Sequence, residues 1–95
     1  MKLWLLLPNE ELPRDFRKNP WDPWYDKCFG AVVEAETESE ARKMVQDHGG
    51  DETREINPST GRKFGYVWLD EQFSTCTELV PEGRTRIIMS DYRAG

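Results

Sequence analysis

Cysteine and histidine are scarce in this chain, which contains only Cys28, Cys76 and His48. A tetrahedral zinc site takes about four Cys, His or acidic ligands at workable spacings, and three scattered residues do not supply them. We therefore predict no metal ion. The two cysteines form no CxxC pair, and the cytosol keeps such thiols reduced. Two buried thiols are the prediction, and a disulfide between them is the alternative.

Long hydrophobic runs are also absent. The run Leu3–Leu7 has five residues, whereas a membrane-spanning helix needs about 18. This run resembles the core of a signal peptide, but a proline and two acids follow it closely, at Pro8, Glu10 and Glu11. We therefore predict a strand at this position and a cytoplasmic protein with no membrane partner.

The chain lacks a basic excess and a recognisable catalytic motif. Its net charge is −5, with 13 Lys and Arg against 18 Asp and Glu, and binding a phosphate backbone requires clustered Lys and Arg. Gly49–Gly50 follows a predicted helix instead of opening one, so it does not form a phosphate-binding loop. Both cysteines fall on predicted strands and the histidine on a helix stripe, which argues against a Cys–His dyad. We predict no direct nucleic-acid binding, no cofactor and no enzymatic activity.

What the chain does contain is material for one small fold. Its 95 residues, 37% of them hydrophobic, correspond to a single domain spanning 1–95. Residues 2–7 and 28–35 are rich in Leu, Val and Phe, which predicts two strands. Thr37 and Glu40 fit a capping box. A stripe at helical spacing follows at Ala41, Met44, Val45 and His48, so a helix over about 38–48 is predicted.

The C-terminal half predicts further strands. In residues 64–69 large aromatic side chains alternate with other residues, which is typical of a strand. A short hairpin around residues 57–61 is a further prediction. Residues 75–80 and 86–90 flank a Pro-Glu-Gly turn, which predicts a closing hairpin. The sequence therefore predicts an α+β fold: an antiparallel sheet of four or five strands with one α-helix packed on one face.

An aromatic loop over residues 19–27 is the first candidate for binding a partner. It carries large aromatic side chains between prolines and acids, and such side chains dominate interface hot spots. The candidate residues of this loop and of the later aromatic stretch are Trp21, Asp22, Trp24, Tyr25, Asp26, Trp68 and Asp70. The alternative is that the rings of the loop fold back as a satellite core, and that the later stretch is a strand end with a turn.

An acidic stretch is the second candidate. Residues 34–55 hold eight acids against three bases, so this stretch carries the whole excess of negative charge. Acids in the first turn of the predicted helix have a structural reason, because the helix dipole favours them. The candidate contacts to a basic partner surface are Glu34, Glu36, Asp51 and Glu52. A solvated acidic face is the alternative.

Three segments carry a family resemblance: WDPWYDKCFG at 21–30, AETESEAR at 35–42, and WLD at 68–70 with STC at 74–76. They resemble a family of short uncharacterised proteins from phages and bacterial genomes. The resemblance implies a phage or mobile-element setting, where small acidic α+β proteins often act as stoichiometric inhibitors of host machinery, as anti-CRISPR proteins do. It carries over no activity and no catalytic residue.

These features predict a non-enzymatic protein-binding module. The resemblance extends this to a phage-encoded inhibitor of a host defence or nucleic-acid-processing protein. The predicted partner is a host protein with a basic surface. The alternative is a small-ligand or nucleotide-binding domain that uses the loop of residues 19–27.

Overall fold

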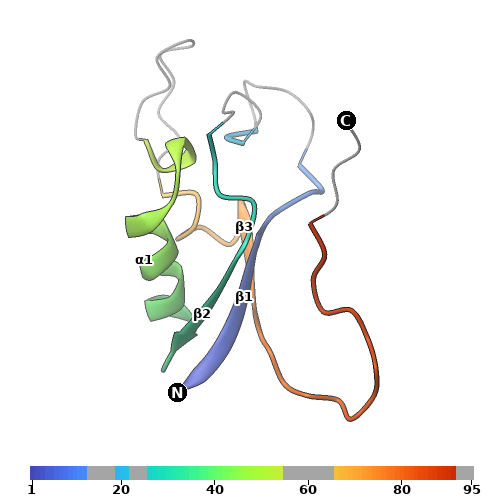
Figure 1. Ribbon diagram of the computed structural model, residues 1–95. Helices are drawn as coiled ribbons and strands as arrows, with labels where there is room; N and C mark the ends of the chain where they lie inside the picture. Colours follow the sequence, from blue (N-terminus) through green and yellow to red (C-terminus); the bar gives the residue numbers. More distant parts are fainter. Residues whose placement is uncertain (13–18, 22–25, 55–65, 92–95) are drawn as a thin grey trace.

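A central strand organises the sheet (Figure 1). In a computed structural model that describes residues 1–12, 19–21, 26–54 and 66–91, β1 (Lys2–Pro8) pairs antiparallel with β2 (Ala31–Ala35) and with β3 (Ser74–Glu78). In this register Leu5 lies opposite Val32 on one side and Thr77 on the other. The predicted first strand is confirmed. Because its residues 3–7 are apolar throughout, β1 buries side chains on both faces of the sheet.

The predicted sheet of four or five strands is wrong: the described residues form a sheet of three. The stretch around Trp68 forms a turn, in which the Leu69 and Asp70 amides donate to the Tyr66 carbonyl at 3.0 and 3.1 Å. Tyr66 has a φ of 62°, in the left-handed region. Val67 and Trp68, which lie in this turn, are both buried. The described part of the aromatic pattern, from Tyr66 to Trp68, therefore belongs to a turn that buries Trp68 in the core.

The predicted closing hairpin does not form either. The Leu79 amide donates to the Leu3 carbonyl at 2.8 Å, and the chain then leaves the sheet. Pro81 has no amide hydrogen for the ladder, so it stops the strand from continuing. Residues 79–91, here called the C-terminal arm, run beside the sheet without forming a strand (Figure 1). The hairpin predicted around residues 57–61 lies almost wholly outside the described residues.

The helix α1 (Glu38–His48) confirms the predicted helix. Thr37 is the N-cap residue, and its Oγ1 accepts a hydrogen bond from the Glu40 amide at 3.2 Å. A short 3₁₀ helix, η1 (Asp51–Thr53), follows. No helix among the described residues is both long enough and apolar enough to cross a membrane.

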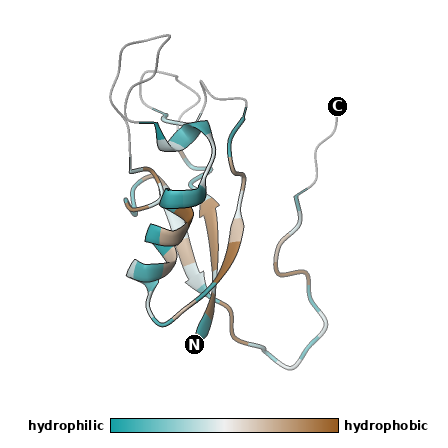
Figure 2. Cartoon of the chain, turned by 60° about the vertical axis from the view of Figure 1, so that its left-hand side comes forward, coloured by the Kyte–Doolittle hydropathy of each residue, from teal (hydrophilic) through white to brown (hydrophobic). Residues whose placement is uncertain are grey.

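The helix covers one face of the sheet, here called the inner face (Figure 2). Trp4 and Leu6 of β1 pack with Ala41 and Val45 of α1 in the core cluster. The other two members of the predicted stripe, Met44 and His48, are exposed. The apolar contact between helix and sheet is therefore narrower than the sequence pattern predicts.

The opposite face, here called the outer face, carries the alternate side chains of β1. These are Leu3, Leu5 and Leu7, since successive strand residues point to opposite faces. The C-terminal arm lies on this side: a Cβ added to Gly30 would lie 2.9 Å from Leu7 Cδ2 and 3.2 Å from Met89 Cε. The chain therefore forms three layers, in the order helix, sheet and arm.

The helix cap provides a first prediction. Replacing Thr37 by Ala should lower the free energy of unfolding by about 1 kcal/mol, because the Glu40 amide loses its acceptor. The urea midpoint measures the change. Ser39→Ala, an exposed change in the first turn of the same helix, is the control and should leave the midpoint almost unaltered. Equal midpoints for the parent and Thr37→Ala would show that the cap does not stabilise the helix.

Candidate functional site

Trp68 is fully buried and lies at the centre of the described core. Its ring meets the Trp21 ring edge to face, with centroids 4.9 Å apart and planes at 72°. Its indole nitrogen donates to Glu52 Oε1 at 3.0 Å, and its amide donates to Gln46 Oε1 at 3.1 Å. Trp21 is also buried, and its indole donates to the Phe73 carbonyl at 2.9 Å. Both tryptophans thus pack in the same core cluster: Trp21 of the loop folds back onto the core, and Trp68 lies in a turn.

Glu52 is a buried carboxylate that joins three segments of the chain. Its Oε1 accepts from the Cys28 amide at 3.1 Å and from the Gly50 amide at 3.0 Å, in addition to the Trp68 indole. Its Oε2 is buried and has no hydrogen-bond partner among the residues that the structure describes. A side chain at Gly50 would collide with the Asp26 carbonyl and the carboxylate. The absence of a side chain at Gly50 therefore allows the Asp26 backbone and the Glu52 carboxylate to lie close to this residue.

Arg42 is a buried cationic residue, and the sequence pattern did not predict its burial. Only 6% of it is exposed. Its Nη1 donates to the Trp68 carbonyl at 2.9 Å and to Ser74 Oγ at 2.8 Å, and its Nη2 donates to the Ser74 carbonyl at 3.2 Å. The only sequence signal was the Glu38–Arg42 spacing, and that ion pair forms at 3.1 Å. Arg42 links α1 to the Trp68 turn and to β3.

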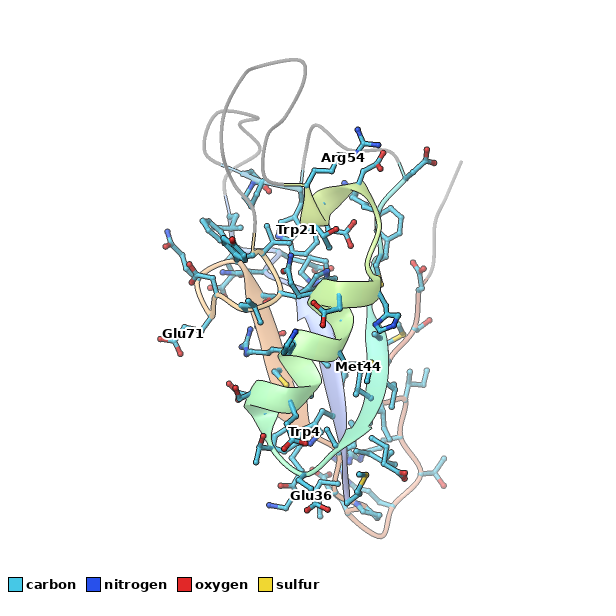
Figure 3. The ribbon with its side chains drawn as sticks, turned by 90° about the vertical axis from the view of Figure 1, so that its left-hand side faces the viewer. Trp4, Trp21, Glu36, Met44, Arg54 and Glu71 are labelled. Carbon is cyan, nitrogen blue, oxygen red and sulfur yellow. The ribbon has the colours of Figure 1, made fainter. Side chains whose placement is uncertain are left out.

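The acidic candidates divide between structural and exposed positions. Glu34 and Glu36 are exposed around the end of β2, and Figure 3 shows Glu36 at the opposite end of the molecule from Trp21. Asp51 is half-buried and pairs with Arg54 at 3.3 Å. Glu52 lies in the core, as described above. Within this stretch, ion pairs also take up the side chains of Glu38 and Asp47, so much of the acidity contributes to local structure.

Two further sequence candidates, Asp26 and Asp70, lie outside the helices and strands. Asp26 is exposed, and its carbonyl accepts from the Asp51 amide at 2.7 Å. Asp70 is exposed, and its Oδ1 accepts from the Gln72 amide at 2.8 Å. Three candidates lie outside the described residues: Asp22, Trp24 and Tyr25. A binding role for any of these residues stays a prediction.

Both cysteines are free thiols, so the disulfide alternative is not found. The Cys28 thiol donates to the Gly30 carbonyl at 3.3 Å. Burial raises the pKa of the Cys76 thiol, and the nearby Arg42 guanidinium partly opposes that rise. Such a thiol carries less thiolate near neutral pH, which makes it a poor nucleophile. Among the described residues, no three His, Cys, Asp or Glu side chains gather where they could hold a metal ion.

A group of exposed apolar side chains lies on the outer face and the C-terminal arm. Its members, here called the outer apolar surface, are Leu3, Val32, Val80, Ile87, Ile88 and Met89. A hollow of about 580 Å³ separates Leu3 from the arm, and a second hollow of about 770 Å³ lies between the arm and the loops at the other end of β1. The arm thus covers the outer face only loosely, and its apolar side chains remain in contact with water.

The buried network around Arg42 provides a second prediction. Arg42→Lys should lower the free energy of unfolding by about 2–4 kcal/mol, because an ammonium group cannot reach Trp68 and Ser74 in the same forked geometry. The matched control is Arg54→Lys, whose exposed ion pair should contribute less than about 1 kcal/mol. Urea unfolding of both variants measures the difference, and similar losses in the two would argue against the network.

Comparison with protein-family models, with curated proteins and with solved structures finds no match for this chain. The resemblance of its three segments to short phage and bacterial proteins therefore stays a prediction, and the exposed apolar side chains become the main basis for proposing a function.

Proposed function

We propose that this chain is a non-enzymatic protein-binding module that contacts its partner through the outer apolar surface. The observation that carries the proposal is the exposure of large aliphatic side chains on an extended arm. Ile87 is 82% exposed, and its neighbours Ile88 and Met89 are also in contact with water. Contiguous exposed apolar side chains of this kind mark interaction sites on folded proteins.

The rim of this surface carries charge of both signs. Glu34 lies opposite Leu3 in the β1–β2 register, at the border of the apolar side chains. Arg84 and Arg86 lie on the arm and pair with Glu82 at 3.0 and 3.5 Å. Apolar centres with charged rims are the usual anatomy of protein interfaces. A partner with a basic group facing Glu34 fits this rim, in line with the predicted basic partner surface.

A phage-encoded inhibitor of a host defence or nucleic-acid-processing protein is the finer form of this proposal. It is supported by the family resemblance and by the small size of the chain. An inhibitor that occludes a site on its target needs a binding surface and no catalytic group, which agrees with a fold whose buried polar residues serve its own structure.

A third prediction tests the binding surface directly. A photo-reactive amino acid at Ile87 should cross-link a protein from a bacterial lysate, whereas the same group at Leu69, an exposed apolar position on the Trp68 turn, should not. The captured protein is then purified and its affinity measured by calorimetry. An Ile88→Asp change should weaken binding by about tenfold or more, since it places a charge in a desolvated contact. Equal cross-linking at both positions would count against the proposal.

Small-ligand binding is the second candidate function, because the hollow of about 770 Å³ has mixed polar and apolar walls. Trp21, Lys27 and Phe29 lie along it, and Lys27 Nζ is 5.3 Å from the Phe29 ring centroid. A cation beside aromatic rings suits an anionic, planar ligand such as a nucleotide. Trp21 itself is too buried to stack on a base, which favours the protein-binding proposal.

A thermal-shift measurement separates the two candidates and gives a fourth prediction. If a nucleotide or cyclic dinucleotide bound in this hollow, a concentration of 100 times its Kd would add about 2.7 kcal/mol to the free energy of unfolding. The protein-binding proposal predicts no saturable shift with any such compound. A saturable shift that is lost in Lys27→Met but retained in Lys43→Met would show that the hollow binds the compound, and it would favour ligand binding as the function.

A further inference from the structure

β2 lies at one edge of the sheet, where among the described residues it pairs only with β1. The backbone amide and carbonyl groups on its other side therefore have no strand partner there, and an edge of this kind accepts a further strand. Val32, in the middle of β2, is 57% exposed. This strand carries neither a proline nor a lysine, the residues that commonly protect an edge from pairing.

The C-terminal arm has the composition of a strand but has no place in the sheet. Ile87, Ile88 and Met89 form a consecutive apolar run, and β-branched residues such as Ile favour strands. Among the described residues, no backbone-to-backbone hydrogen bond involves residues 81–90, and the Val80 carbonyl accepts from Arg86 Nη2 at 3.0 Å. The arm is therefore an extended segment whose backbone is open to pairing.

One antiparallel register matches the arm to β2 in both charge and apolarity. On the outer face it joins Arg86 to Glu34 and Ile88 to Val32, and its continuation places Arg84 opposite Glu36, in the bend that follows the strand. Residues directly opposite each other share a face of the sheet and interact. On the inner face the same register places Ile87 opposite Val33. A shift by one residue would separate both charge pairs and exchange the two faces of the arm, and a shift by two residues would keep only one charge pair.

The charged members of this register are available for exchange. Glu34 and Glu36 are exposed, and Glu36 is 3.9 Å from the N-terminal ammonium. Arg84 and Arg86 are engaged by Glu82 within the arm. Ion pairs at a protein surface contribute little to stability, so new cross-strand pairs can replace them without a large penalty.

The arm of the same chain does not occupy this edge. Ile88 lines the hollow next to Leu3, and Met89 lies close to Gly30 on the outer side. Each chain carries both the open edge and the matching arm, so two copies related by a twofold axis can each donate one strand and accept one. Reciprocal exchange of this kind forms a closed dimer.

We propose that the partner of the outer apolar surface is a second copy of this chain, whose C-terminal arm pairs as an antiparallel strand with the edge of β2. This inference rests on the proposed protein-binding function and assigns its partner. The dimer extends each three-stranded sheet by one strand and brings Ile87 and Ile88 out of water.

A pair of charge reversals tests the register. Arg86→Glu and Glu34→Arg should each weaken the dimer by about tenfold or more, because each places like charges opposite one another twice per dimer. An equimolar mixture should form a heterodimer, since each arm then meets an edge of opposite charge. Native mass spectrometry separates the heterodimer from the two homodimers, and circular dichroism with urea unfolding verifies that both variants fold.

The matched control mixes Glu34→Arg with Arg54→Glu. Arg54 is an exposed arginine that the register does not join to β2, so Arg54→Glu should form its own homodimer like the parent. It should form little heterodimer with Glu34→Arg, because its Arg86 would then meet an arginine at position 34. Cross-linking from a photo-reactive group at Ile87, in a mixture of ¹⁴N and ¹⁵N protein, should connect the two isotopic forms at residues 31–35. Cross-links to these residues within one chain only would show that the arm folds back on its own edge and would overturn the proposal.

The two proposals fail in different ways. A chain that stays monomeric at millimolar concentration, or a charge-reversal mixture that stays monomeric, overturns the second-copy proposal. Capture of a different protein at Ile87 from lysate then leaves the protein-binding function standing. A heterodimer in the mixture together with no captured protein supports the second copy and removes the host partner. A monomer that captures nothing at Ile87 overturns both.

Discussion

Burial of the Trp68 indole is the constraint on which the rest of the described structure depends. A buried indole N–H needs an acceptor, and Glu52 provides it. A buried carboxylate in turn needs donors, and the loop amides of Cys28 and Gly50 converge on the same oxygen. One aromatic side chain thereby determines the paths of three segments that lie far apart in the sequence.

Arg42 extends this network to the secondary structure. Its guanidinium group satisfies the carbonyls of Trp68 and Ser74, and its Nε pairs with Glu38 at the partly exposed start of the helix. Replacing one partner of such a network leaves the others buried and unpaired, which costs more than the bond itself contributes. The buried polar groups therefore specify how α1, β3 and the Trp68 turn are placed relative to one another.

The described residues leave the outer face of the sheet incompletely covered. The one α-helix among them packs on the inner face of the three-stranded sheet, and it cannot cover both faces. The C-terminal arm lies on that side (Figure 2), and its Ile87 and Ile88 side chains are exposed. An apolar face in this state gains from association, which is why the outer apolar surface, and not the buried aromatic side chains, supports the proposed function.

The sequence by itself determined the helix and the central strand. The Thr37 cap, the helical spacing of Ala41 and Val45, and the unbroken Leu3–Leu7 run are signals contained within a few residues, and the structure follows them. The tertiary structure alone decided that residues around Trp68 form a turn, that residues 86–90 form no strand, and that Arg42 and Glu52 are buried. Those outcomes depend on hydrogen bonds between residues far apart in the sequence. Cys28 and Glu52 are 24 positions apart, and Arg42 and Ser74 are 32 positions apart. Hydrogen bonds between such distant residues leave no local pattern in the sequence, because a buried polar group finds its partner only when another segment of the chain packs against it.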